Sequence, residues 1–125
     1  MTVPSSQELA LACARFADDV KAENIVVLDV KIISSITDFF VICSATSEPH
    51  LRAIRRDIIA GVQDALGEKP AYAEGDAASH WLVVDYINVM VHIFHEEKRS
   101  FYAMEDLWRD APRLDLNALL SVPGK

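Results

Sequence analysis

The stretch FFVICSA, residues 39–45, constrains the fold of this chain more than any other part of its sequence. It is apolar without alternation, whereas a strand with one face in water alternates apolar and polar residues. A continuous apolar run of this length is typical of a strand that is buried on both faces. The sequence therefore predicts a sheet whose central strand is covered by helices.

Helical patterns occur on both sides of this strand. Ser5 with Glu8 three residues later forms a capping box, which predicts a helix that begins at Ser5 and ends near residues 23–24. A second helix is expected to begin at residue 46 or 47, to carry apolar residues at helical spacing, and to stop at Gly67. These two helices are the expected cover of the sheet.

The remaining strands follow from short β-branched runs. One is predicted at 25–30, a short one near 70–74, and a hairpin from 80–86 to 89–94 whose turn at Ile87–Asn88 places Asn at positive φ. A last helix is expected over 97–108. The predicted fold is a single α/β domain over residues 1–110, with a mixed sheet of about five strands flanked by helices and a tail over 111–125.

The charge of the chain limits its partners. The formal net charge is −7, and residues 70–97 contain five acidic side chains and no Lys or Arg. An acidic surface repels the phosphate backbone, so direct recognition of nucleic acid is not expected. A partner of this region is expected to be basic, or to offer a protein surface. No apolar stretch reaches the length of a membrane span, and the N-terminus lacks targeting patterns, which predicts a soluble, cytoplasmic protein without membrane contact.

Candidate catalytic and metal-binding groups are few. Cys13 and Cys43 lack zinc-site spacing and are expected to be buried and free of disulfide. His92 and His95 are three apart on an expected strand, so they point to opposite faces and cannot readily share a metal ion unless the strand ends between them. No motif for a nucleotide or for nucleophilic catalysis is present. No metal and no cofactor is expected.

Two clusters allow more than one interpretation. Arg52, Arg55 and Arg56 form a basic group that is typical of a solvated helix face. Trp81 begins a strand beside an acidic connection, where it fits either the core or an exposed interface. The residues alone leave both interpretations of Trp81 open.

Four segments, taken together, resemble one known family. They are DFFVICSATSEPHLRAI, HWLVVDY, VMVHIF and SFYAMEDLW, in this order within residues 5–110. The pattern resembles the ribosomal silencing factors, also called the Iojap family. The resemblance implies a fold similar to nucleotidyltransferases without that catalysis. It also implies binding to a ribosomal protein on the intersubunit face of the large ribosomal subunit, which blocks joining of the small subunit and lowers translation under nutrient limitation.

The resemblance also implies a partner-binding surface. Its residues in this sequence are Trp81, Leu82, Asp85, Asp38, Ser44 and Tyr102, and the closing-helix motif adds Leu107 and Trp108. Two positions depart from the family pattern. Ile87–Asn88 stands where the family has Gly-Asp, and Ala45 stands where a glycine is usual. The segment from Ala111 extends past the usual end of the pattern and is given no role.

Two other functions remain as alternatives. One is a nucleotidyltransferase-like enzyme that would use Asp38 and Asp85 with a metal ion and a nucleotide. The other is a homodimeric interaction module whose aromatic residues pair with those of a second copy. The leading prediction is a non-enzymatic inhibitor of translation that binds the large subunit through a basic ribosomal protein and acts by steric exclusion.

Overall fold

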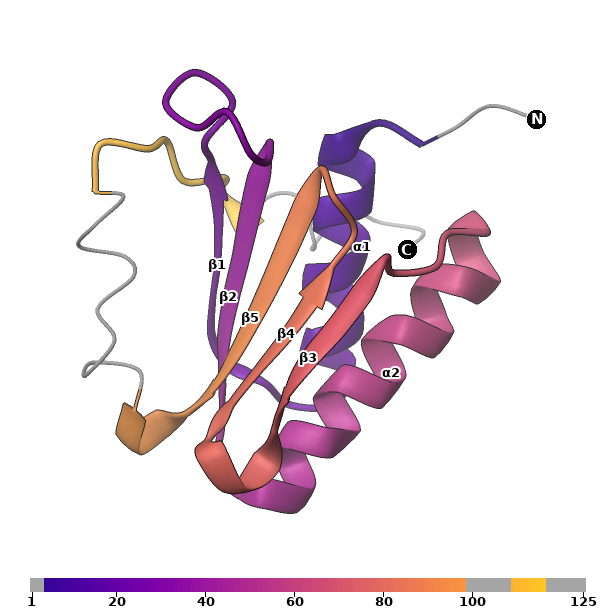
Figure 1. The fold of residues 1–125 in the computed structure, drawn as a ribbon, viewed down its shortest axis with the longest axis vertical. Helices are drawn as coiled ribbons and strands as arrows, with labels where there is room; N and C mark the ends of the chain where they lie inside the picture. Colours follow the sequence, from indigo (N-terminus) through magenta and orange to yellow (C-terminus); the bar gives the residue numbers. More distant parts are fainter. Residues whose placement is uncertain (1–3, 99–108, 117–125) are drawn as a thin grey trace.

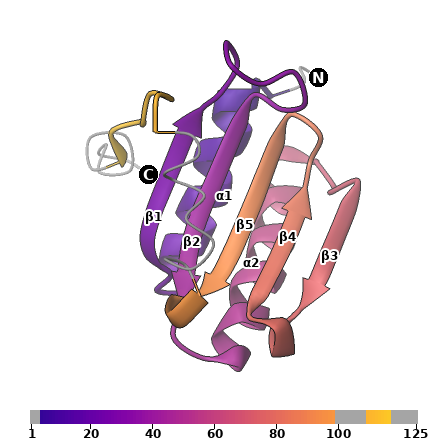
Figure 2. The ribbon, with the colours of Figure 1, turned by 60° about the vertical axis from the view of Figure 1, so that its left-hand side comes forward.

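The computed structural model describes residues 4–98 and 109–116. Within these residues, five strands form one sheet in the order β1-β2-β5-β4-β3, and two helices cover one of its faces (Figure 1, Figure 2). The strands are β1 Glu23–Asp29, β2 Phe39–Ala45, β3 Tyr72–Asp76, β4 Trp81–Asp85 and β5 Val89–His95. The helices are α1 Ser6–Asp19 and α2 Glu48–Leu66, with a short 3-10 turn η1 at Ala77–Ser79.

The sheet is mixed, as predicted. β2 and β5 run parallel at its centre, and the other neighbouring strands are antiparallel. The prediction of a single α/β domain with a mixed sheet of about five strands flanked by helices is confirmed. In the part of the chain that is described, no helix combines the length and the apolar character that a membrane span requires.

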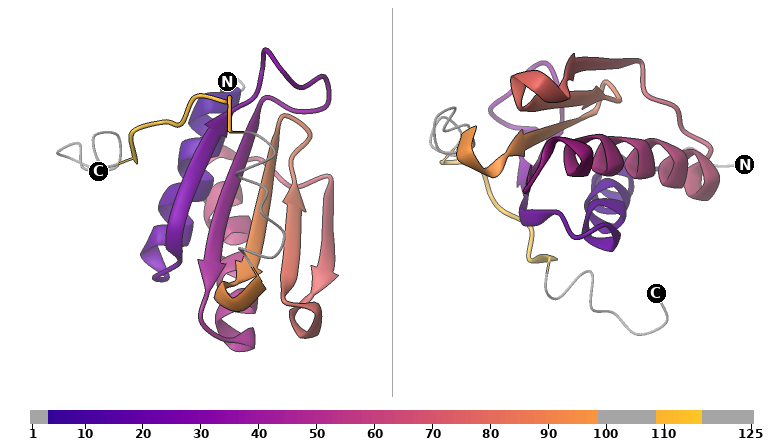
Figure 3. Two further views of the ribbon diagram at one scale, coloured as in Figure 1. Left: turned by 90° about the vertical axis from the view of Figure 1, so that its left-hand side faces the viewer. Right: turned by 90° about the horizontal axis from the view of Figure 1, so that it is seen from below.

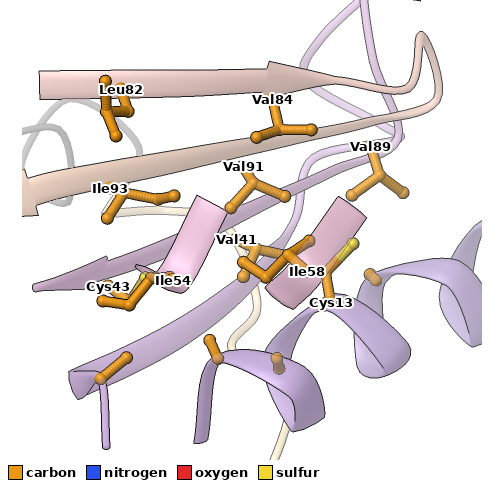
Figure 4. Packing of buried hydrophobic residues seen from close by; sticks show 14 of the residues in the cluster. Cys13, Val41, Cys43, Ile54, Ile58, Leu82, Val84, Val89, Val91 and Ile93 are labelled. Carbon is orange, nitrogen blue, oxygen red and sulfur yellow. The ribbon is translucent and has the colours of Figure 1, made fainter. Parts of the chain in front are cut away.

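β2 is the buried central strand that its apolar run predicts. It lies between β1 and β5, and all seven of its residues are buried. Val41 and Cys43 belong to the core cluster between the sheet and the helices, where Cys13 of α1 also lies (Figure 4). Phe40 and Ile42 belong to a second cluster on the other side of the sheet. Burial on both faces is therefore confirmed, and both cysteines are buried and free.

The starts of both helices follow the predicted caps. The Ser5 side chain accepts the N–H of Glu8 in a complete capping box, and Ser47 caps α2 in the same way through the N–H of His50. Gly67 ends α2 in the left-handed conformation, with φ 71°. The side chains of α2 that face the sheet are Leu51, Ile54, Ile58 and Val62, all buried.

The predicted end of the first helix is wrong. α1 ends at Asp19 and not near residues 23–24. Lys21 takes a left-handed φ of 67°, its N–H bonds to the carbonyl three residues back, and the N–H of Ala22 bonds to the carbonyl five residues back. These are the two hydrogen bonds of a Schellman motif, which usually has glycine at the position of Lys21. The missing glycine removed the signal from which this end could have been predicted.

The turn between β4 and β5 also differs from its prediction. Ile87, and not Asn88, takes the positive φ, at 76°. The N–H of Asn88 donates to the carbonyl of Tyr86 at 3.0 Å, and the N–H of Ile87 donates to a carboxylate oxygen of Asp85 at 2.7 Å. The Asp85 side chain therefore stabilises a conformation that a β-branched residue rarely adopts.

We expect Ile87→Gly to raise the free energy of unfolding by about 1 kcal/mol. Glycine relieves the left-handed strain, and little burial is lost because Ile87 is half-exposed. Urea denaturation measures the change. The matched control is Ile36→Gly, since Ile36 is also exposed and has no positive φ. That variant should be destabilised by about 0.5–1 kcal/mol, and equal destabilisation of both variants would contradict the strain.

The two edges of the sheet differ. β3 begins two residues later than the start of its predicted range, and its side chains are all exposed. At the other edge, Arg113 forms an isolated bridge to Leu28, and the carbonyl of Pro112 accepts the N–H of Asp29 at 2.8 Å. Residues 109–116 thus contact β1.

The predicted closing helix is described only at its start, where residues 96–98 are helical. The rest of the predicted closing helix, with Tyr102, Leu107 and Trp108, lies outside the described residues.

Candidate functional site

Of the residues implied by the family resemblance, Trp81 and Asp85 lie on the face of the sheet away from α1 and α2. This face is called here the distal face, and Figure 3 shows the sheet with both helices behind it. On β4 the side chains alternate, with Leu82 and Val84 buried against the helices and the others on the distal face. Because directly paired residues share a face, the register extends this set to β3 and β5. The distal face comprises Trp81, Val83 and Asp85 of β4, Met90, His92 and Phe94 of β5, and Tyr72, Glu74 and Asp76 of β3.

Trp81 lies on the distal face and is partly buried. Its ring stacks on Phe94, with centroids 5.5 Å apart, and on His92, with centroids 6.0 Å apart. Its Nε1–H donates to Nδ1 of His92 at 3.3 Å. Trp81 packs against the second hydrophobic cluster and keeps part of its surface exposed. The core interpretation therefore holds for the packed part of the side chain, and the interface interpretation stays a prediction.

His92 packs against the ring of Trp81 and accepts its hydrogen bond. It was not predicted as a site residue from the sequence. It is 5% exposed, and burial lowers its pKa to about 4, against a smaller opposite effect of the Asp85 charge. The ring is therefore neutral at pH 7. Because Nδ1 accepts from Trp81, the proton sits on Nε2, and this buried donor has no acceptor in the described part of the chain. His92 lies near Trp81 only because β4 pairs with β5, and the sequence alone did not give the register of that pairing.

Asp85 lies at the end of β4 on the distal face. One of its carboxylate oxygens accepts the N–H of Ile87 in the turn that follows β4. In the register Asp85 pairs with Met90 on one side and with Tyr72 on the other. Its charge is therefore placed where the distal face meets the β4–β5 turn.

The other residues that the family resemblance implies lie in different environments from Trp81 and Asp85. Leu82 is fully buried in the core on the helix side, so it supports β4 and offers no surface. Ser44 is buried and pairs with Phe94, which places it on the distal side of β2. Asp38 is partly exposed just before β2, and its N–H donates to the carbonyl of Asn88 at 2.9 Å. Tyr102 lies outside the described residues.

The enzymatic alternative requires Asp38 and Asp85 to hold one metal ion. Asp38 and Asp85 adjoin β2 and β4, and β5 lies between these strands. A carboxylate oxygen of Asp85 already accepts the N–H of Ile87 at 2.7 Å, and in the described residues no third His, Cys, Asp or Glu completes a metal site with these two acids. A hollow of about 510 Å³ lies between α1 and α2, on the opposite side of the sheet. Its lining residues are Phe16, Asp19, Asp57, Ala60, Gly61 and Asp64, so neither predicted acid contributes to it.

The histidines do not form one cluster. His92 lies on the distal face, whereas His95, three residues later, stacks on His80 with ring centroids 4.7 Å apart. Nε2 of His80 is 3.6 Å from a carboxylate oxygen of Glu48. The opposite orientation of His92 and His95 is the one that strand alternation predicts. In residues 4–98 and 109–116 no group of three His, Cys, Asp or Glu side chains is arranged to hold a metal ion.

The distal face is acidic and partly aromatic. Glu74 and Asp76 lie on the exposed edge strand beside Trp81 and Val83, and Asp85 lies at the other end of β4. The sequence from Tyr72 to His95 contains no Lys or Arg. Partly exposed aromatic surface surrounded by charge of one sign is typical of a protein-binding surface for a partner of the opposite charge.

Comparison with known proteins supports the family resemblance. The family model "Ribosomal silencing factor during starvation" matches residues 3–124. The ribosomal silencing factor RsfS of Halalkalibacterium halodurans is 38% identical over 117 residues, covering 94% of this chain and 99% of that protein. "Mitochondrial assembly of ribosomal large subunit protein 1" of Mus musculus is 34% identical over 89 residues, covering 70% of this chain and 39% of that protein.

The solved structures agree with these sequence matches. A crystal structure of a protein from Bacillus halodurans has a TM-score of 0.75 and 36% identity, covering 87% of this chain and 98% of that one. The family model spans residues 111–124 as well, so the expectation that this segment extends past the family's end is wrong. The domain boundary at residue 110 stays a prediction. On the match of the family model to residues 3–124 and of a 38% identical relative to 94% of its length, this chain belongs to the family of ribosomal silencing factors.

Proposed function

We propose that this chain lowers translation by binding the large ribosomal subunit through its distal face. The proposed contact is a basic ribosomal protein on the intersubunit face, and the bound factor excludes the small subunit sterically under nutrient limitation. The observation that carries this proposal is the acidic distal face with a partly exposed Trp81. The names of the relatives support a role at the ribosome, and one of them names the large subunit.

Charge favours a protein contact over a contact with RNA. Ribosomal RNA presents phosphates, which the carboxylates of Glu74, Asp76 and Asp85 repel. A basic protein surface is attracted by the same carboxylates, and this attraction raises the rate of association more than the final affinity. Steric exclusion needs no large interface, because the factor has only to remain bound longer than the interval between encounters of the subunits.

The proposal predicts binding to large subunits and not to small subunits or free RNA. We expect the protein to co-sediment with purified large subunits and to be absent from tightly coupled ribosomes. Adding it to separated subunits should reduce their joining, as followed by light scattering. Equal co-sedimentation with small subunits or with free ribosomal RNA would contradict the proposal.

The contribution of charge is tested by the double variant Glu74→Lys/Asp85→Asn. Asn keeps a side-chain oxygen for the turn at Ile87, so the change is mainly electrostatic. We expect association with large subunits to slow by about tenfold at low salt, and the difference to shrink as salt rises. The control is Arg55→Glu on α2, which lies on the other side of the sheet and should leave the rate nearly unchanged. The reverse result would place the contact on α2.

The enzymatic alternative has its own test. Calorimetry with nucleoside triphosphates and magnesium should show no saturable binding. Tight binding with turnover that Asp85→Asn abolishes would support a nucleotidyltransferase-like enzyme instead. Sedimentation velocity of the free protein tests the homodimeric module, which requires that the distal face be covered in solution by a second copy.

A further inference from the structure

The exposed large apolar side chains of the described residues gather at one end of the sheet. They are Ile32 (96% exposed), Ile33 (48%), Ile36 (67%), Tyr72 (59%) and Ile87 (53%). The first three lie in the connection between β1 and β2, Tyr72 begins β3, and Ile87 is in the β4–β5 turn. Figure 1 shows the β1–β2 connection and the β4–β5 turn at the same end of the molecule. We call these five residues the isoleucine tip.

Hydrogen bonds join the segments that form the isoleucine tip. The N–H groups of Asp38 and Phe39 donate to the carbonyl of Asn88 at 2.9 and 3.2 Å, which ties the end of the β1–β2 connection to the β4–β5 turn. The N–H of Ala71 donates to the carbonyl of Asp85 at 2.8 Å, which places Tyr72 beside the same turn. These bonds hold the backbone of the three segments together at one end of the sheet.

The connection between β1 and β2 has its own internal hydrogen bonds. The carbonyl of Val30 accepts the N–H groups of Ile33 and Ser34, at 3.2 and 2.7 Å, and the Ser34 hydroxyl accepts the N–H of Ile36 at 3.2 Å. Val30 and Thr37, at its two ends, are buried. The backbone is thus held at several points while the isoleucine side chains stay in water. A group of exposed apolar side chains of this kind marks an interaction surface.

We propose that the isoleucine tip is the apolar half of the docking surface, and that it binds an apolar patch on the same basic ribosomal protein that faces the distal face. This inference rests on the function proposed above and extends it. Asp85 links the two regions, because it lies on the distal face and its carboxylate bonds to Ile87. The bound partner therefore touches the isoleucine tip and the acidic strands together.

Charge selects this partner over a second copy of the chain. Asp29, Asp38 and Asp85 border the isoleucine tip, and the nearby Lys31 forms an ion pair with Asp29 at 3.3 Å. Two copies that met through this region would bring like charges together, in a chain of net charge −7. A partner with an apolar patch in a basic surround satisfies both the isoleucines and the carboxylates.

The test is the double variant Ile32→Ser/Ile36→Ser, with Ser35→Asn as the matched control. Both changed isoleucines are exposed, so the urea midpoint should not fall. Ser35 is an exposed polar residue of the same connection, and its replacement alters no apolar surface. We expect the double variant to bind purified large subunits at least about tenfold more weakly. The loss should appear in the dissociation rate and be insensitive to salt, because it removes apolar contact.

The outcomes separate this inference from the proposed function. If the wild-type protein binds large subunits and the double variant binds within about twofold of it, the inference fails and the function stands. If the wild-type protein does not bind large subunits, both fail. If the wild-type protein is a dimer in sedimentation velocity and the double variant is a monomer, the occupant of the isoleucine tip is a second copy and the inference is overturned.

Discussion

Trp81→Ala is expected to lower the free energy of unfolding by about 3 kcal/mol. The truncation removes the stacking of the indole on Phe94 and His92, and it leaves Nδ1 of His92 without its donor. A fully buried tryptophan costs about 3–5 kcal/mol on truncation, and Trp81 belongs at the lower end because part of it is exposed. Urea denaturation followed by circular dichroism measures the change.

Trp81→Phe is the matched variant. Phenylalanine keeps the aromatic contact with Phe94 but cannot donate to His92, so a loss of about 1 kcal/mol is expected. Binding to large subunits is then compared at a temperature where both variants are folded. If Trp81 also contacts the partner, Trp81→Ala should bind about thirtyfold more weakly, whereas Trp81→Phe should retain most of the affinity. Unchanged stability of Trp81→Ala would contradict the packing described for the distal face.

Acidification is expected to remove about 3 kcal/mol of stability through His92 alone. The folded protein holds the pKa of His92 at about 4, below the ordinary value of 6.5, because the ring is buried. Between these two values the unfolded chain binds a proton that the folded chain does not. The stability due to neutral His92 is therefore complete above pH 6.5, falls as the pH decreases toward 4, and does not change further below that.

The measurement is the free energy of unfolding from pH 7.5 to 3.5 for the wild-type protein and for His92→Phe. Phenylalanine does not titrate, so the curve of the variant should be flatter over this range, and carboxylates that titrate in both proteins cancel in the difference. The variant loses the hydrogen bond from Trp81 at every pH, which shifts its curve without changing the slope. Parallel curves would show that His92 is accessible to protons in the folded state.

The distal face and the isoleucine tip offer different kinds of contact. Carboxylates on β3 and β4 act at a distance, which in the proposed function is the means of steering the basic partner toward the sheet. The isoleucines act only on contact, when water leaves their surface. The proposed function requires both, because a factor has to find the large subunit and then remain bound to it. The charge variant is expected to change the association rate, and the isoleucine variant the dissociation rate.

Local patterns in the sequence were sufficient for several features. The unbroken apolar run of residues 39–45 identified the central strand, because no other position in a sheet buries both faces. Ser47 and Gly67 identified both ends of α2, because a hydroxyl cap and a left-handed glycine act on their own backbone. Trp81 and Asp85 are four residues apart on one strand, so alternation alone placed them on the same face of β4. That this face binds a partner stays a prediction.

Other features were decided only by tertiary structure. Ile87 rather than Asn88 takes the positive φ, in a turn whose Asn88 carbonyl accepts the N–H groups of Asp38 and Phe39 from the distant start of β2. Trp81 is half-buried because pairing with β5 brings Phe94 and His92 under its ring, although both lie more than ten residues away. The isoleucine tip exists because the order β1-β2-β5-β4-β3 brings distant turns to one end of the sheet. A hydrogen bond between residues close in sequence can be predicted from the local sequence. Strand order, and the contacts that follow from it, depend on the packing of the whole chain.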